Sequence, residues 1–175
     1  MERNIVLIGM PGSGKTQVGK RLAAALSRPY FDADEALVAL AGESIATLFA
    51  QGEEVFRDWE TKTCAALAKK TGAVIATGGG VVKREENIRL LRENGVMVFL
   101  DRAPEDIVAD VDCAGRPLLK NGPGEVYRLY EERIALYRAA CDLTVKNDSS
   151  LEEAVGRVAS AVAAWEDERK EMTEE

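Results

Sequence analysis

The stretch GMPGSGKT at residues 9–16 combines residue types that bind the phosphate groups of a nucleotide. It fits the pattern G-x-x-x-x-G-K-[ST] and follows an apolar run at residues 4–8, which is the context expected of a phosphate-binding loop. Glycines let backbone N–H groups turn inward around a phosphate, Lys15 reaches the outer phosphates, and the hydroxyl group of Thr16 holds Mg²⁺. Motif and context together disfavour a Gly-rich turn without a ligand. We therefore expect ATP and Mg²⁺ to bind here, with ATP contacted by Gly12, Ser13, Gly14, Lys15, Thr16 and Gln17.

This loop alone does not decide what receives the phosphoryl group, because GTPases and motor ATPases use similar loops. A guanine-binding protein usually carries an N-K-x-D sequence after a later strand, and here Lys146-Asn147-Asp148 has the wrong order. The chain, at 175 residues, is also short for a motor. A kinase that phosphorylates a small molecule is therefore the leading hypothesis.

Two carboxylates in the stretch Phe31-Asp32-Ala33-Asp34 are candidates for the acceptor side of the reaction. Side chains two residues apart in an extended segment point the same way, roughly 6.5 Å apart. One carboxylate would face Mg²⁺ through water, while the other accepts a hydrogen bond from the acceptor hydroxyl group. The alternative is that Asp34 only caps the helix that follows.

Arg57 and Glu60 are three residues apart in a predicted helix and share one of its faces. Glu60 would hold the guanidinium group of Arg57 in one orientation, and a guanidinium group binds a carboxylate through two parallel hydrogen bonds. Taken alone, the pair fits a surface ion pair better than an anion site. If the pair is an anion site, Arg57 would bind a planar anion such as a carboxylate.

Three glycines, Gly78-Gly79-Gly80, follow Thr77 at the end of a predicted strand. Glycines permit a close approach between the backbone and a ligand, whereas a simple turn needs no more than one of them. We therefore favour a ligand-binding segment over a flexible turn.

Two arginines later in the chain complete the set of candidates. Arg116 lies in a Gly- and Pro-rich loop at residues 112–124, and loops of this length inside a compact domain are often functional lids. Arg133 lies at the edge of an apolar stripe on a predicted helix, where a single arginine is usually just solvated.

Alternating strands and helices must position these residues. Short apolar runs predict buried strands, and a stretch with helical spacing follows each of them, the last being a final helix that closes the domain. This order predicts a parallel sheet with helices on both faces, in which ligands collect beyond the carboxyl ends of the strands. The predicted strands are residues 4–8, 30–31, 73–77, 96–100 and 143–145. We expect one domain at residues 1–165, with a charged, frayed tail at 166–175.

The composition is that of a globular chain, with 46% hydrophobic and 30% charged residues. A formal net charge of −7 disfavours a broad electrostatic surface for nucleic acid. The absence of histidine excludes a histidine base or metal ligand, and the three cysteines have no metal-like spacing. No apolar run reaches the roughly 20 residues of a membrane helix. We expect a cytoplasmic protein that contacts neither nucleic acid nor a membrane.

Taken in order, the motifs resemble those of the shikimate kinase family. The matching pieces are GMPGSGKT, FDAD, GE–FR–E, ATGGG, RPLL and R-x-x-LY followed by Cys141-Asp142. The resemblance implies an α/β, three-layer P-loop NTPase fold, with a five-stranded parallel sheet flanked by helices and a mobile lid at about residues 110–124. It also implies transfer of the γ-phosphoryl group of ATP to the 3-hydroxyl group of shikimate, a step of aromatic amino acid biosynthesis.

The resemblance also implies a role for each candidate residue. By similarity, Lys15 and Arg116 hold the transferring phosphate of ATP and Asp34 bonds the reacting hydroxyl group, so these three are the catalytic candidates. Thr16 and Asp32 lie on the Mg²⁺ side. Two arginines from separate helices clamp the carboxylate of shikimate, and two glycines contact its ring through backbone amides. The implied shikimate-binding residues are Asp34, Arg57, Gly79, Gly80 and Arg133.

One position departs from the family's pattern. The family often has an arginine upstream of the lid that packs on adenine, and Asp110 stands in its place here. The nucleotide preference therefore stays open. The alternatives to a shikimate kinase are a kinase for another small hydroxy acid, such as gluconate, and a non-catalytic nucleotide-binding regulator. The family resemblance suggests a monomer.

Overall fold

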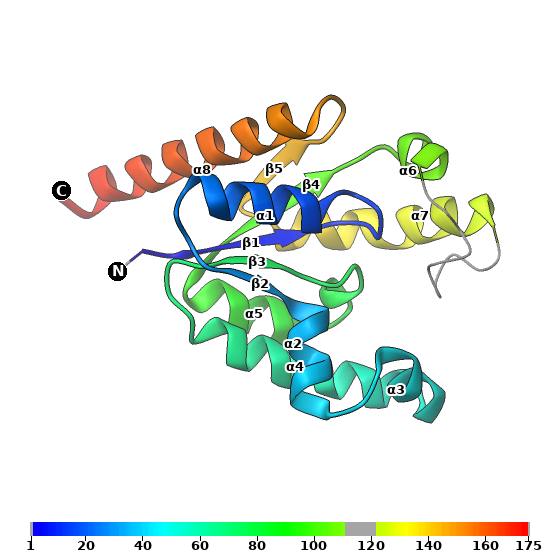
Figure 1. The fold of residues 1–175 in the computed structure, drawn as a ribbon. Helices are drawn as coiled ribbons and strands as arrows, with labels where there is room; N and C mark the ends of the chain where they lie inside the picture. The colour runs from blue at the N-terminus through cyan, green and yellow to red at the C-terminus, as the bar shows by residue number, and fades with distance from the viewer. Residues whose placement is uncertain (1, 111–121, 175) are drawn as a thin grey trace.

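The computed structural model describes residues 2–110 and 122–174. These residues form a five-stranded sheet in which neighbouring strands run parallel, in the order β2-β3-β1-β4-β5 (Figure 1). The predicted parallel sheet is confirmed, and each predicted strand agrees with an observed one to within one residue at each end. The strands are β1 (Asn4–Ile8), β2 (Tyr30–Asp32), β3 (Val74–Ala76), β4 (Gly95–Asp101) and β5 (Leu143–Lys146).

Helices cover both faces of the sheet and give the predicted three layers (Figure 1). One layer holds α1 (Lys15–Ala25) and α8 (Leu151–Glu174), and the other holds α4 (Glu53–Ala68), α5 (Glu85–Glu93) and α7 (Pro123–Ala140). The central strand β1 serves both layers, because successive side chains of a strand point to opposite faces. Ile5 and Leu7 pack with α1 and α8, whereas Val6 and Ile8 pack with α4, α5 and α7.

Short elements complete the domain beside these layers. They are α2 (Ala33–Ala41), α3 (Ile45–Gln51), the 3₁₀ helix η1 (Val81–Lys83) and α6 (Pro104–Asp110). Ser44 accepts a hydrogen bond of 3.1 Å from the backbone N–H of Thr47 and so caps α3. The helices α2, α3 and α4 bury a small apolar cluster of their own, formed by Leu37, Leu48 and Phe56.

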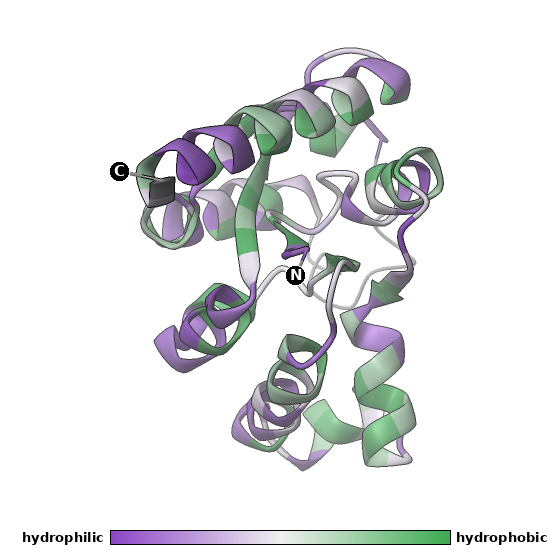
Figure 2. Cartoon of the chain, turned by 90° about the vertical axis from the view of Figure 1, so that its left-hand side faces the viewer, coloured by the Kyte–Doolittle hydropathy of each residue, from purple (hydrophilic) through white to green (hydrophobic). Residues whose placement is uncertain are grey.

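The hydropathy of the helices explains the layering. Figure 2 shows hydrophobic residues on the inward sides of the helices and hydrophilic residues on the outward sides. Burial of those apolar sides against the sheet is what holds the helices in place. Within residues 2–110 and 122–174, no helix combines the length and the apolar character that crossing a bilayer requires.

The last helix extends through the segment that was expected to be a tail. The sequence predicted a charged, frayed tail at residues 166–175, but α8 continues to Glu174. The added turns consist mostly of good helix formers, and Lys170 pairs with Asp167 at 3.1 Å, three residues away on the same face. Charge density alone was therefore a poor guide to fraying, because charged residues of both signs support an exposed helix.

Candidate active site

The phosphate-binding loop connects β1 to α1 at the carboxyl end of the central strand. Its backbone takes left-handed conformations at Gly12 and Gly14, with φ angles of 83° and 97°. A Cβ atom at Gly14 would lie only 2.8 Å from Nδ2 of Asn147, and that same Nδ2 donates a hydrogen bond of 2.8 Å to the carbonyl oxygen of Ser13. The loop therefore needs glycine here and is fastened to the chain after β5.

The N-terminus of α1 is arranged to receive an anion. Gly14 is its N-cap, no side chain caps the helix, and its first turn contains no acidic residue. The positive end of the helix dipole and its backbone N–H groups are thus available to a phosphate. Lys15 is 8% exposed, and its Nζ donates to the carbonyl oxygens of Gly9 and Met10 at 2.7 and 2.8 Å. These bonds hold the ammonium group within the loop.

Thr16 and Asp32 meet at the hydroxyl group of Tyr30. The Tyr30 hydroxyl donates to Oδ2 of Asp32 at 3.4 Å, and the side chain of Thr16 acts on the same hydroxyl group and lowers its pKa. Burial, followed by the charge of Asp32, raises the pKa of Tyr30 to about 12, so the hydroxyl group stays protonated. The two predicted Mg²⁺ residues are therefore brought together beside the phosphate loop.

Asp32, rather than Asp34, caps α2. Its Oδ1 accepts hydrogen bonds from the backbone N–H groups of Asp34 and Glu35, at 2.9 and 3.1 Å. The alternative that Asp34 serves only as a helix cap is therefore wrong. Oδ1 of Asp34 instead lies beside the glycine turn, where a Cβ atom added to Gly78 would be 3.2 Å from it.

The electrostatic environment of Asp34 favours proton retention. The residue is exposed to solvent, but the protein around it removes part of the water from its carboxyl group, and this loss of water is the largest cause of a raised pKa. The neighbouring charge of Asp32 raises the pKa further, whereas Lys15 and Arg57 oppose the change. Asp34 is thus electrostatically coupled to both the phosphate loop and an arginine of α4.

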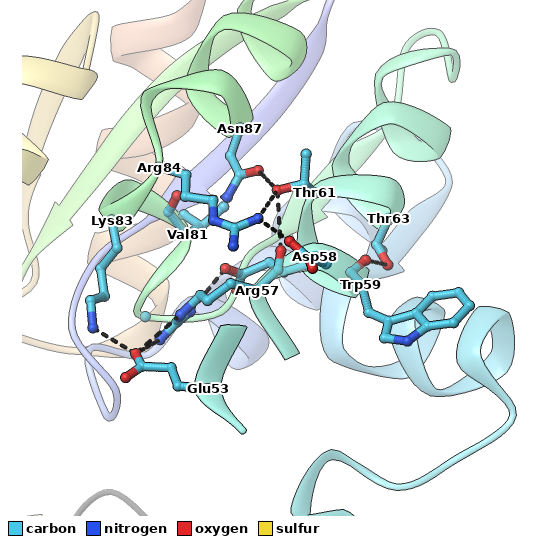
Figure 3. A network of polar contacts seen from close by, with 12 residues as sticks. Glu53, Arg57, Asp58, Trp59, Thr61, Thr63, Val81, Lys83, Arg84 and Asn87 are labelled. Atoms are coloured by element: carbon cyan, nitrogen blue, oxygen red, sulfur yellow. Dashed lines mark hydrogen bonds and ion pairs between the residues drawn. The ribbon is translucent and has the colours of Figure 1, made fainter. Parts of the chain in front are cut away.

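Arg57 and Glu60 form a buried pair, so the surface ion pair suggested as an alternative is wrong. Nη1 of Arg57 donates to Oε1 of Glu60 at 2.8 Å, and the two side chains are 5% and 7% exposed. Burial raises the pKa of Glu60, while the guanidinium group of Arg57 opposes that rise. Figure 3 shows Arg57 reaching toward the segment that follows the glycine turn.

The glycine turn after β3 is where the chain packs most closely against these groups. A Cβ atom at Gly80 would lie 2.5 Å from both Nη1 and Nη2 of Arg57, and one at Gly79 would lie 2.6 Å from Cδ of Pro11. A Cβ atom at Gly78 would also come within 3.4 Å of Oε2 of Glu60. These contacts leave no room for side chains at the turn, so a merely flexible turn does not account for the three glycines.

Arg133 is buried, contrary to the expectation for a lone arginine at a helix edge. It is 2% exposed, and within the described residues its Nε and Nη1 atoms have no hydrogen-bond partner. Its charge acts on Glu60 and on Tyr137, and Arg57 also acts on Tyr137. Burial nevertheless raises the pKa of Tyr137 to about 12. Two guanidinium groups from α4 and α7 thus converge on one region, and one of them has unused donors.

The family model described as shikimate kinase matches residues 11–163 of the chain. The chain belongs to the shikimate kinase family. A shikimate kinase from Clostridium botulinum strain Eklund 17B (type B) is 44% identical over 158 residues, which is 90% of this chain and 96% of the relative.

Solved structures of other shikimate kinases share the fold. The enzyme from Acinetobacter baumannii, in complex with shikimate, superposes with a TM-score of 0.87 at 29% identity and covers 94% of both chains. The enzyme from Aquifex aeolicus has a TM-score of 0.79 at 35% identity and covers 91% of this chain and 96% of its own. The predicted P-loop kinase fold is thereby confirmed.

In this member of the shikimate kinase family, a cavity of about 380 Å³ lies beside the phosphate loop. Nη1 of Arg102 donates to the carbonyl oxygen of Gly12 at 3.0 Å, and its Nη2 pairs with Asp110 on α6. The residue that departs from the family's pattern is thus bound to an arginine at the end of β4. Arg116 and most of the predicted lid lie outside the described residues. Residues that line the cavity include Gly14, Gln17, Arg102, Asp106, Asp110 and Asn147.

Three residues of this shikimate kinase site did not emerge from the sequence. Tyr137 lies one helical turn after Arg133, so the period of the helix indicated its face. Arg102 directly follows a strand, where ligands of parallel sheets collect. Tyr30 had no distinguishing signal, because an aromatic residue in a short strand is usually a packing residue.

Proposed function

We propose that this member of the shikimate kinase family transfers the γ-phosphoryl group of ATP to the 3-hydroxyl group of shikimate, giving shikimate 3-phosphate and ADP. The observation that carries the proposal is the buried guanidinium group of Arg133, whose Nε and Nη1 have no partner within the described residues. A buried cation with unused donors is costly unless an anion joins it. The carboxylate of shikimate would be that anion, clamped by Arg133 together with Arg57.

The remaining groups of the pocket would hold the ring of the substrate. Asp34 lies beside Gly78 and is coupled electrostatically to Lys15, which supports a position between the glycine turn and the phosphate loop. From there its carboxylate would accept a hydrogen bond from the reacting hydroxyl group and orient it toward the γ-phosphate. Backbone groups of Gly79 and Gly80 would contact the ring, since these glycines lie beside Arg57, which is proposed to bind the carboxylate of the same substrate.

The phosphates of ATP would occupy the N-terminus of α1. Lys15 would move from the loop carbonyl groups to the phosphates, where its charge opposes the negative charge of the transition state. Arg116 lies outside the described residues and stays a prediction. As a lid arginine it would join Lys15 at the transferring group and exclude water from the reaction.

Thr16 and Asp32 fit Mg²⁺ because a hydroxyl group and a carboxylate supply the oxygen donors that this ion prefers. Oδ1 of Asp32 is engaged in capping α2, so Oδ2, beside Tyr30 and Thr16, is the atom we propose for the metal side. When bound, Mg²⁺ would neutralise part of the negative charge on the phosphates of ATP. Within the described residues no group of three or more acidic, histidine or cysteine side chains forms a separate metal site.

The nucleoside would enter the cavity of about 380 Å³ between the phosphate loop and α6. The cavity begins at Gly14, so a base placed there is continuous with phosphates at the N-terminus of α1. One chain supplies every group assigned here, so a monomer suffices. We further propose that the protein acts in the cytoplasm, where ATP is abundant.

The test measures ADP formation by the purified protein with ATP and Mg²⁺, in the presence of shikimate, of gluconate, or of no acceptor. We expect ADP to form well above background only with shikimate. Equal turnover with and without shikimate would refute the acceptor assignment, and turnover with gluconate alone would favour the other hydroxy acid. ATP binding without turnover under any condition would indicate a nucleotide-binding regulator.

A further inference from the structure

One carboxylate oxygen near the substrate pocket is shared between two cations. Oε1 of Glu53 accepts a hydrogen bond from Nζ of Lys83 and two from Arg57, through Nε and Nη2 (Figure 3). Glu53 is the first residue of α4, and Lys83 is the last residue of η1, directly beyond the glycine turn. The contact therefore joins the helix that carries Arg57 to the turn that borders the pocket.

The distances show which cation holds the oxygen more closely. Nζ of Lys83 is 2.6 Å from Oε1 of Glu53, whereas both nitrogen atoms of Arg57 are 3.4 Å away. Charge-assisted hydrogen bonds between nitrogen and a carboxylate are normally about 2.7–2.9 Å long. The contact with Lys83 is thus close, and the two contacts with Arg57 are stretched.

A Glu53 carboxylate without Lys83 would move toward Arg57. The two residues are four apart on α4 with the glutamate on the N-terminal side, which is the favourable orientation for a helical ion pair. Nη1 of Arg57 is already bonded to Glu60 at 2.8 Å. The Nε and Nη2 atoms form another edge of the guanidinium group, which can bind a carboxylate through two parallel hydrogen bonds, and Glu53 faces those same atoms.

We propose that Lys83 is a positioning residue for acceptor binding, because it holds the carboxylate of Glu53 away from Arg57 and keeps Arg57 available to the carboxylate of the substrate. This inference rests on the proposed function, in which Arg57 binds shikimate. In this view the carboxylate of Glu53 competes with the carboxylate of the substrate for Nε and Nη2 of Arg57. The Lys83 side chain is 31% exposed and that of Glu53 is 49% exposed, so their ion pair contributes little to folding stability.

The experiment compares Lys83→Met, Glu53→Gln and the double variant with the wild-type protein. The dissociation constant for shikimate is measured by calorimetric titration, and KM for shikimate and kcat are measured by ADP formation. We expect Lys83→Met to raise Kd and KM about tenfold, the effect of roughly one charge-assisted hydrogen bond, with kcat within about twofold. The double variant should return to within about threefold of the wild type, because the competitor has lost its charge.

Arg84 provides a matched control. It joins the same two regions of the chain through ion pairs with Glu54 and Asp58, at 2.7 and 2.8 Å, but touches neither Glu53 nor Arg57 in the contacts that Figure 3 draws. Arg84→Met should leave Kd for shikimate within about twofold of the wild type, since it removes comparable ion pairs without freeing the competitor. A loss in Arg84→Met equal to that in Lys83→Met would overturn the proposal in favour of a general structural role.

Two further results would overturn the proposal. If Lys83→Met binds shikimate like the wild type, then Lys83 does not restrain Glu53. If the defect of Lys83→Met persists unchanged in the double variant, then Lys83 contacts the substrate directly or supports the fold. Failure of the wild-type protein itself to bind or phosphorylate shikimate would instead refute the proposed function, and this inference with it.

Discussion

The hydroxyl group of Tyr137 donates a hydrogen bond of 2.5 Å to the carbonyl oxygen of Gly79. This bond ties α7, which carries Arg133, to the glycine turn after β3. The same turn packs against Arg57 through Gly80, so one short segment fixes the positions of both arginines. The spacing of the two guanidinium groups therefore depends on a backbone carbonyl group rather than on a direct bond between them.

Tyr137→Phe tests this link. The change removes one hydrogen bond within a buried side chain, and we expect a loss of about 1–2 kcal/mol in the free energy of unfolding. The turn would also gain freedom, so Kd for shikimate should rise several-fold while Kd for ATP stays constant. Urea unfolding and two calorimetric titrations measure these quantities. An equal loss of affinity for both ligands would contradict a role confined to the acceptor side.

Arg133→Met separates binding from stability. The side chain is 2% exposed and its Nε and Nη1 lack partners within the described residues, so the empty protein carries an incompletely compensated cation. We expect the ligand-free variant to be as stable as the wild type or more stable. Shikimate affinity should fall by at least about 100-fold, because a hydrogen-bonded charge pair is lost. Urea unfolding without ligand and calorimetry with shikimate test both halves.

The matched control is Arg138→Met, on the exposed side of the same helix. It removes the same charge from α7 without touching the pocket, so shikimate affinity should stay within about twofold of the wild type. A large loss of stability in Arg133→Met, but not in Arg138→Met, would show that the guanidinium group of Arg133 stabilises the fold and is not held in reserve to bind the substrate.

Gly80→Ala places a methyl group where the guanidinium group of Arg57 lies. The added Cβ atom would be 2.5 Å from two of its nitrogen atoms, so Arg57 must move. We expect KM for shikimate to rise about tenfold or more and KM for ATP to change little. Gly156→Ala on α8 is the control, because among the described residues an added Cβ atom there meets nothing within 4 Å. Normal kinetics in Gly80→Ala would exclude a fixed position for Arg57.

The sequence predicted the sheet, the phosphate loop and the candidate residues, because strands and loops of this kind carry local signals. It could not decide between roles that depend on burial. Arg133 and the pair of Arg57 with Glu60 looked like surface charges in isolation, and only the packing of α7 and α4 against the glycine turn shows that they are buried. Which aspartate caps α2 was equally undecided, since Asp32 and Asp34 both suit an N-cap position.

Asp34→Asn should change stability in a pH-dependent way. The pKa of Asp34 is raised above its ordinary value of 3.8 by loss of water and by Asp32, so its charged form is disfavoured in the folded protein. Below the pKa that Asp34 has in the unfolded chain, its neutral side chain makes its full contribution to the free energy of unfolding. That contribution is lost as the pH rises through the pKa that Asp34 has in the folded protein. At pH 7 the variant should therefore be more stable, by under about 1 kcal/mol because solvent screens this group.

The stability difference should disappear below the ordinary pKa of the carboxyl group, where the wild-type side chain is neutral as well. Urea unfolding at pH 3 and pH 7 measures it. Phosphoryl transfer by Asp34→Asn should fall at least about 100-fold, because the acceptor hydroxyl group loses its charged partner. A variant that is less stable than the wild type at pH 7 would contradict the raised pKa.

Arg102→Met tests the nucleotide side. Arg102 donates to the carbonyl oxygen of Gly12 and pairs with Asp110, so it fixes the phosphate loop relative to α6. Its loss would loosen the loop and remove a cation from the cavity, and we expect KM for ATP to rise about five- to tenfold. Kd for shikimate measured without nucleotide should not change, because Arg102 has no contact with the glycine turn among the described hydrogen bonds.

Asp110→Asn separates the two contacts of Arg102. The neutral side chain weakens the ion pair on α6 but leaves the hydrogen bond of 3.0 Å to Gly12 in place. If the bond to the loop is the important one, Asp110→Asn should raise KM for ATP by no more than about twofold, far less than Arg102→Met. Equal effects of the two variants would instead assign the nucleotide affinity to the position of α6. Titration of ATP and GTP into both variants also shows whether Asp110, in place of an arginine, alters the preference for the base.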